Sequence, residues 1–141
     1  PAYAVLGTSM LAQGRQTEAI EALEQSLAHG DHPETHFNLA AAYLARNNYE
    51  LAEQQLDAAI RLRPFMANAW KYKARLLAAR NEDALARDAF IHTLALQPLD
   101  LPLYGELIDL LRSLGQAEEA ERYLELGLRM SRRVADIQAG N

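Results

Sequence analysis

The sequence contains no cysteine, little glycine or proline, and few aromatic residues. The absence of cysteine excludes a disulfide framework and any thiolate metal site. With only seven glycines and five prolines in 141 residues, long stretches run without a helix breaker, and alanine and leucine dominate them. Because alanine and leucine are strong helix formers, this composition favours an all-α fold.

Other absences narrow the class of protein. No apolar run approaches the roughly 20 residues that a membrane-spanning helix needs, so we expect no membrane insertion. No signal peptide or lipidation motif is visible. The net charge of −5 argues against a nucleic-acid partner, because phosphate binding requires an excess of basic residues. The chain begins PAYAVLG, without methionine and already in a helical pattern, which indicates a piece of a longer protein.

The most informative feature is an internal repeat. Four alanines lie 33, 34 and 34 residues apart, and a large apolar residue follows each of them four positions later. Apolar residues at this spacing form a stripe along one face of a helix. The alanines are Ala19, Ala52, Ala86 and Ala120, and the apolar residues are Leu23, Leu56, Phe90 and Leu124.

Five residues before each alanine stands a residue that tolerates a left-handed backbone: Gly14, Asn47, Asn81 or Gly115. Each repeat is therefore predicted to be two helices joined by a tight turn. The recurring small residue marks the closest approach of the paired helices, where a larger side chain would overpack the contact by roughly 1–3 kcal/mol. Pro64 and Pro98 close the second and third repeats.

With these offsets the sequence resembles the tetratricopeptide repeat family. The resemblance rests on segments such as YAVLGTSM, HFNLAAAY and WKYKARLL, together with Trp70, Ala74, Ala86, Phe90 and Pro98. It implies an all-α, right-handed superhelical solenoid of four antiparallel helix-turn-helix repeats. We expect a single domain, residues 1–141, with repeats at about 1–32, 33–66, 67–100 and 101–134 and a C-terminal tail at 135–141. The alternative is an unrelated helical bundle, which does not require a small residue at a fixed period.

By the same resemblance, the first helix of each repeat lines a concave groove that holds a ligand. Helical geometry selects the residues that belong neither to the packing stripe nor to the outer flank. The predicted groove residues are Val5, Thr8, Leu11, Phe37, Asn38, Ala41, Leu44, Lys71, Tyr72, Arg75, Glu106 and Asp109.

These residues run from an apolar end through a basic and aromatic centre to an acidic end. This pattern predicts a ligand with an apolar portion over Val5, Phe37 and Leu44, and an acidic group near Lys71 and Arg75. Two alternatives stay open: the two basic side chains are solvated and offset by the acidic groove residues, and Phe37 packs locally.

Some family members clamp the C-terminal carboxylate of a chaperone with Lys, Asn and Arg side chains. Only Asn38 falls on a matching position here. Ala4, Thr8 and Tyr72 stand where that pattern needs Lys, Asn and Arg, and Asn68 replaces another Lys. We therefore do not expect chaperone-tail binding of that kind.

One cluster has the residue types of a metal site. It lies between the first two repeats and comprises His29, Asp31, His32, Glu34 and His36. His36 occupies the aromatic packing position of its repeat, and the others belong to a solvated turn, so we expect no metal. Phosphate loops, nucleophile elbows and His-Glu-x-x-His motifs are missing from the sequence, and we expect neither a catalytic residue nor a cofactor.

The sequence thus predicts a non-enzymatic scaffold that binds a peptide or protein segment in its groove. Two alternatives remain. The chain could be the recognition arm of a larger enzyme, such as a repeat-bearing glycosyltransferase. It could also be a self-associating subunit of a bacterial envelope, secretion or pilus assembly, with homo-oligomers formed through open solenoid ends. Candidates at the C-terminal end are Leu110, Leu114, Tyr123 and Leu126.

Overall fold

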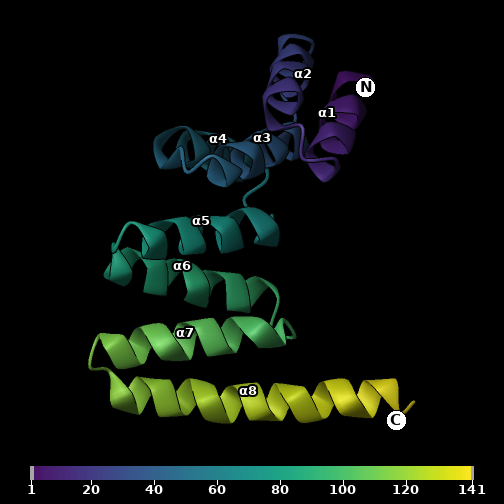
Figure 1. Cartoon of the computed structure of the whole chain (residues 1–141). Coiled ribbons are helices and arrows are strands. Elements are labelled where there is room, and N and C mark those ends of the chain that lie inside the picture. The colour runs from purple at the N-terminus through teal and green to yellow at the C-terminus, as the bar shows by residue number, and fades with distance from the viewer. Residues whose placement is uncertain (1, 141) are drawn as a thin grey trace. The chain divides into compact units, whose positions relative to one another are not determined.

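Eight α-helices and no β-strand make up residues 2–140, the part of the chain that the computed structural model describes. Figure 1 shows them in chain order. They are α1 (Ala2–Ala12), α2 (Gln16–Ala28), α3 (Pro33–Ala45), α4 (Tyr49–Leu62), α5 (Ala67–Ala79), α6 (Asp83–Leu96), α7 (Leu101–Ser113) and α8 (Ala117–Gln138). The predicted all-α fold class is confirmed.

The tight turns lie where the sequence predicts them. Gly14 and Gly115 have φ of 74°, and Asn47 and Asn81 have φ of 57° and 59°. These are the left-handed values that let a helix end abruptly. The residue after each of them donates its backbone N–H to a carbonyl five positions back. The four bonds are Arg15 to Met10 (2.9 Å), Asn48 to Tyr43 (2.9 Å), Glu82 to Leu77 (2.9 Å) and Gln116 to Leu111 (2.8 Å).

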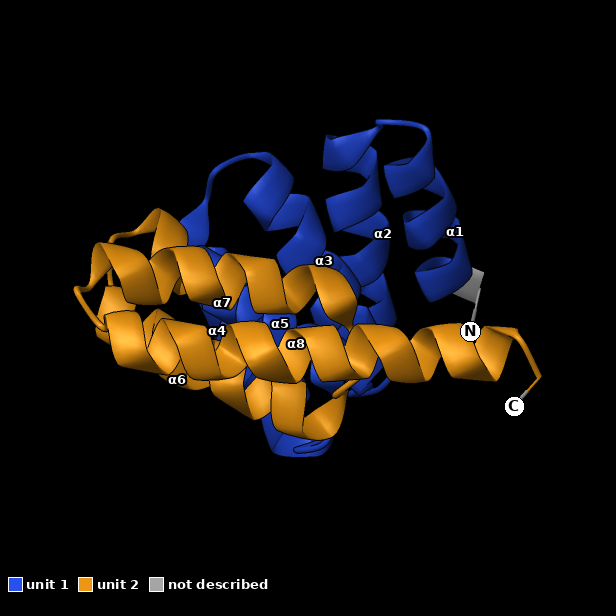
Figure 2. Cartoon of the chain, turned by 90° about the horizontal axis from the view of Figure 1, so that it is seen from below, with its two compact units in different colours: residues 1–76 blue, residues 77–141 orange. Residues whose placement is uncertain are grey.

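The chain divides into two units, residues 1–76 and 77–141, and the division falls within α5 (Figure 2). In the first unit α1 packs on α2, α2 on α3, and α3 on α4. In the second, α6 packs on α7 and α7 on α8. Within each unit, consecutive helices therefore form the hairpins that a two-helix repeat requires.

The recurring alanines belong to the buried core of the hairpins. Ala19, Ala52, Ala86 and Ala120 are all completely buried. Gly7 of α1 marks a similarly close approach to α2, because a Cβ added there would lie 2.6 Å from Cγ of Leu23. The burial of the four alanines agrees with the predicted close packing, and the exclusion of larger residues from their positions stays a prediction.

An aromatic side chain near the start of the first helix ties two of the repeats to the turn before them. Trp70 donates its indole N–H to the carbonyl of Pro64 at 2.9 Å, and Tyr104 donates its hydroxyl to the carbonyl of Pro98 at 2.7 Å. The two bonds are equivalent, since the residues lie 34 positions apart. This bond fixes how the chain enters the next helix.

Lys73 is an exception to the repeat. Leu39 and Leu107 occupy its place in α3 and α7 and are almost fully buried. In α5 the ammonium of Lys73 donates instead to the carboxylate of Asp57 on α4 at 2.5 Å, and it lies 6.0 Å from the centroid of the Trp70 ring. A buried leucine is thus replaced by a partly buried ion pair between neighbouring helices.

Candidate functional site

Ten of the twelve predicted groove residues lie in the first unit, on α1, α3 and α5. Two direct contacts link them from one first helix to the next. Asn38 of α3 donates its side-chain amide to Oγ1 of Thr8 on α1 at 3.0 Å. The rings of Phe37 on α3 and Tyr72 on α5 lie 4.9 Å apart with planes tilted by 57°. Residues that the repeat pattern assigned to one surface are therefore in contact across three helices.

Exposure varies along this surface. Val5 is 70% exposed, and Thr8 and Arg75 are also exposed. Six other residues of this surface are half-buried: Phe37, Asn38, Ala41, Leu44, Lys71 and Tyr72. Leu11 is half-buried as well, and it packs against the core cluster of Ile20, Leu23, Leu39 and Ala42. Leu11 therefore supports the hairpin as well as bordering the surface.

Phe37 packs locally, which is one of the two alternatives that its sequence position left open. Its partner is Tyr72, so the two rings form a shared apolar platform between α3 and α5. Aromatic pairs at this distance and tilt are typically worth about 0.5–1.5 kcal/mol beyond the area they bury. This contact holds the accessible faces of the two rings in fixed positions.

The two acidic residues of the predicted groove lie on α7, in the second unit. Glu106 is half-buried and Asp109 is exposed. The assignment of both residues to a ligand-binding groove stays a prediction from the sequence.

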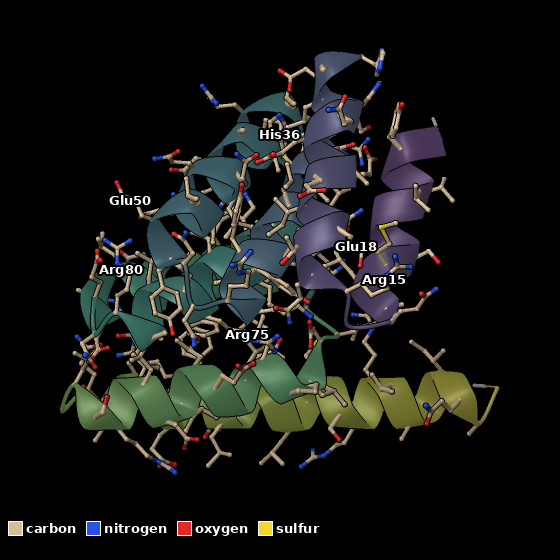
Figure 3. The ribbon with its side chains drawn as sticks, turned by 45° about the horizontal axis from the view of Figure 1, so that its top comes forward. Arg15, Glu18, His36, Glu50, Arg75 and Arg80 are labelled. Atoms are coloured by element: carbon tan, nitrogen blue, oxygen red, sulfur yellow. The ribbon has the colours of Figure 1, made fainter. Side chains whose placement is uncertain are left out.

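Three members of the cluster between the first two repeats, Asp31, Glu34 and His36, have polar partners. His36, labelled in Figure 3, is 8% exposed. Its ring nitrogens face the carboxylate of Asp31 and the side-chain oxygen of Gln55. His29 stacks on Tyr3, with ring centroids 5.6 Å apart. Glu34 accepts from Arg63 at 2.5 Å. Throughout residues 2–140, no three His, Asp or Glu side chains are grouped so that they could hold a metal ion.

Local hydrogen bonds and burial shift the pKa values of several groups. Burial raises the pKa of Tyr43 to about 12, and the hydrogen bond to Glu24 at 2.9 Å adds to the effect. The pKa of Glu34 is lowered chiefly by its own backbone N–H at the start of α3, and further by Arg63. A hydrogen bond from Arg15 lowers the pKa of Glu18 at the α1–α2 turn (Figure 3). None of these groups lines the surface of predicted groove residues.

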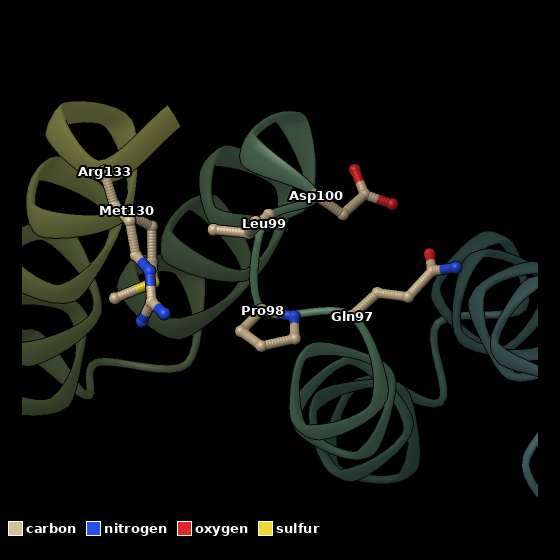
Figure 4. Close-up of a pocket in the computed structure, with 6 residues that line it drawn as sticks. All are labelled: Gln97, Pro98, Leu99, Asp100, Met130 and Arg133. Atoms are coloured by element: carbon tan, nitrogen blue, oxygen red, sulfur yellow. The ribbon is translucent and has the colours of Figure 1, made fainter. Parts of the chain in front are cut away.

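The sequence reasoning missed one surface feature, a cavity of about 680 Å³ in the second unit. The α6–α7 turn and the second half of α8 form it, with Gln97, Pro98, Leu99, Asp100, Met130 and Arg133 as lining residues (Figure 4). A signal was available: Arg132 stands where Pro64 and Pro98 end the second and third repeats. Since proline is missing there, α8 continues to Gln138 and passes the turn.

The order and spacing of these hairpins match a known family of proteins. A family profile described as the tetratricopeptide repeat matches residues 4–67 and, one repeat further on, residues 37–100. The chain belongs to the tetratricopeptide repeat family. No curated protein matches the chain.

Solved structures of tetratricopeptide proteins share its fold. A crystal structure of MamA is 21% identical and superposes with a TM-score of 0.89, covering 95% of this chain and 79% of MamA. The first tetratricopeptide domain of Spaghetti (RPAP3), solved with the HSP90 peptide SRMEEVD, is 21% identical with a TM-score of 0.77. That match covers 81% of this chain and 94% of the Spaghetti domain. The predicted tetratricopeptide solenoid fold is confirmed at this level.

No helix within residues 2–140 combines the length and the apolarity needed to cross a bilayer.

Proposed function

We propose that this tetratricopeptide chain is a non-enzymatic scaffold that holds a segment of a partner protein on the surface formed by α1, α3 and α5. The observation that carries the proposal is the contact of predicted groove residues across these helices, Thr8 with Asn38 and Phe37 with Tyr72. A surface whose side chains are already fixed loses less conformational entropy when it binds.

The side chains suggest the chemistry of the segment. Val5 and the edge of Leu44 offer apolar contacts at one end, while Lys71 and Arg75 supply positive charge at the other. An extended or helical segment with an apolar half and an acidic half fits this order. The related Spaghetti domain was solved with a peptide, which supports a protein segment as the class of ligand.

A chaperone tail is not the partner that we propose. The one side chain on a matching position, Asn38, is already hydrogen-bonded to Thr8, and the basic clamp residues of the family pattern are replaced. The identity to the Spaghetti domain is low enough that the likeness extends to the fold alone.

The test uses synthetic peptides with an apolar half followed by an acidic or a basic half. Binding is measured by fluorescence anisotropy, and we expect micromolar affinity, about −8 kcal/mol, for the acidic version only. The triple variant Lys71→Ala, Tyr72→Ala, Arg75→Ala should weaken binding at least about tenfold, or roughly 1.4 kcal/mol.

The matched control is the triple variant Glu50→Ala, Gln54→Ala, Arg61→Ala, which changes exposed residues of α4. It should bind the acidic peptide like the unmodified chain. If the groove variant keeps full affinity while its circular dichroism shows intact helices, the proposed binding surface is wrong.

A further inference from the structure

The last helix carries an apolar stripe that its hairpin partner covers only in part, at Tyr123, which lies near Tyr104 of α7. Tyr123, Leu126, Met130, Val134 and Ile137 follow one another at intervals of three, four, four and three residues. Leu126 is 37% exposed and Ile137 57% exposed, and the other three are half-buried. This alternation of threes and fours is the spacing by which one helix packs along another. Glu119, one turn before Tyr123, marks the N-terminal limit of the stripe.

A row of three arginines borders the stripe on one side. Arg122, Arg129 and Arg133 are separated by seven and four residues, which places them along a single edge of the helix. Arg122 and Arg133 form no ion pair or hydrogen bond with any residue between 2 and 140. Arg129 approaches Glu125 at 4.0 Å, with both side chains at least 70% exposed, so this pair contributes little.

The carboxylates of α8 lie beyond the arginines. Helical spacing places Glu118, Glu125 and Asp136 on the side of the arginine row that faces away from the stripe. The surface therefore changes from acidic to basic to apolar around the helix. The edge next to the apolar stripe is positive, although the chain as a whole carries a net charge of −5.

The cavity beside the α6–α7 turn opens onto the same face. Met130 and Arg133 form one wall, and Pro98 and Leu99 face them from the turn (Figure 4). Leu99 is 42% exposed there. The volume of about 680 Å³ is large enough to accept a bulky apolar side chain from a neighbouring helix.

We propose that α8 docks an acidic amphipathic helix of a partner protein. The apolar face of the partner lies along the stripe, one large side chain enters the cavity, and carboxylates on one edge pair with the arginine row. Helical spacing of the stripe selects a helix as the docked element. The unpaired guanidinium groups favour acidic residues along the adjacent edge of the partner helix, since like charges across an interface are disfavoured.

The same charges argue against a second copy as the occupant. In an isologous, antiparallel pairing of two α8 helices, identical edges meet, and each arginine row would face the other. The docking site is also independent of the proposed groove, which uses different helices.

The experiment measures binding of the 141-residue chain to a synthetic helical peptide. The peptide has leucines spaced as a helix-pairing seam and glutamates along one edge, and a second peptide has lysines in place of the glutamates. We expect the glutamate peptide to bind and the lysine peptide not to bind. In the triple variant Arg122→Glu, Arg129→Glu, Arg133→Glu, affinity for the glutamate peptide should fall at least about tenfold, and the lysine peptide should now bind.

Two controls distinguish binding at α8 from binding elsewhere on the chain. Arg61→Glu on α4 should leave binding unchanged. The groove variant Lys71→Ala, Tyr72→Ala, Arg75→Ala should leave intact the part of the glutamate-peptide binding that the arginine variant removes. The proposal is overturned if both peptides bind the unmodified chain equally well. It is also overturned if the triple arginine variant loses affinity for the glutamate peptide but does not bind the lysine peptide. Concentration-dependent self-association that the arginine variant abolishes would identify a second copy as the occupant and would also overturn it.

Discussion

At the residue scale, glycine has two different roles inside helices. Gly7 lies against Leu23 and the carbonyl of Ala19, whereas Gly105 on α7 has no neighbour within 4 Å of an added Cβ. The first glycine is required by close packing. The second only adds flexibility to a helix.

We predict opposite effects for the same substitution at these two sites. Gly7→Ala should lower the free energy of unfolding by about 1–3 kcal/mol, because Cγ of Leu23 and the backbone of α2 must move. Gly105→Ala should raise it by roughly 0.5–1 kcal/mol, because alanine is the better helix former. Urea unfolding followed by circular dichroism measures both. Equal effects at the two sites would contradict the close approach of α1 and α2.

Tyr43 provides a test based on pH. Its pKa is raised from 10.0 to about 12, so the folded state binds this proton more tightly than the unfolded chain does. The stabilisation is complete below pH 10 and is lost as the pH rises towards 12. Burial also raises the pKa values of Tyr104 and Tyr123, so absorbance of tyrosinate after a rapid pH jump should show several late-ionising groups, and Tyr43→Phe should remove one of them. Glu24→Gln should shift that step to lower pH without abolishing it, because burial is the larger cause.

At the scale of the helical hairpin, one residue with positive φ sets each turn. Asn47 has φ of 57° and precedes Asn48, whose side chain accepts from the backbone N–H of Leu51 at the start of α4. The end of one helix and the start of the next are thus fixed within two residues.

Substitutions at Asn47 should follow the cost of the left-handed conformation. Asn47→Val should destabilise the chain by about 1–2 kcal/mol, since a β-branched residue is strained there. Asn47→Gly should stay within about 0.5 kcal/mol of the original, since glycine adopts this φ freely. Thermal unfolding distinguishes the two. A valine variant as stable as the glycine variant would show that the turn relaxes to another conformation.

The positions of these hairpins could be predicted from the sequence because their causes are local. Gly14, Asn47, Asn81 and Gly115 stand at a fixed distance from a buried alanine, and each requirement involves a few neighbouring residues. The contacts of Thr8 with Asn38 and of Lys73 with Asp57 depend on how helices stack, and the repeat pattern does not encode them. The missing proline at position 132 indicates a longer last helix, but the cavity beside Met130 also depends on how that helix passes the turn at Pro98 and Leu99, which the repeat pattern does not encode.

At the scale of the whole molecule, a repeat protein has stability distributed among neighbouring elements and lacks one central core. The packing within residues 1–76 and within residues 77–141 illustrates this, because helices contact those next to them in the chain. Leu39 belongs to the cluster that α2 and α3 share.

We predict that damage to this cluster stays local. Leu39→Ala creates a cavity that should cost about 2–5 kcal/mol. Hydrogen exchange measured by mass spectrometry should then accelerate strongly in α1 to α4 and much less in α7 and α8. A uniform loss of protection throughout residues 2–140 would instead show that the chain unfolds as one cooperative unit.

The ion pair of Lys73 with Asp57 has a consequence for assembly of the repeats during folding. Hairpins of similar sequence compete for the same neighbours, and most of their matching surfaces are interchangeable leucines and alanines. The positions equivalent to Asp57 are occupied by Glu24 in the first repeat, Ile91 in the third and Glu125 in the fourth, so only the third repeat offers no acceptor to an ammonium group. Docking of the Lys73 face of α5 against α6 would place the ammonium group next to Ile91 without a carboxylate, whereas α2 and α8 carry a glutamate at the equivalent position. The pair therefore disfavours one wrong neighbour, the helix of the third repeat, and does not discriminate against the other two.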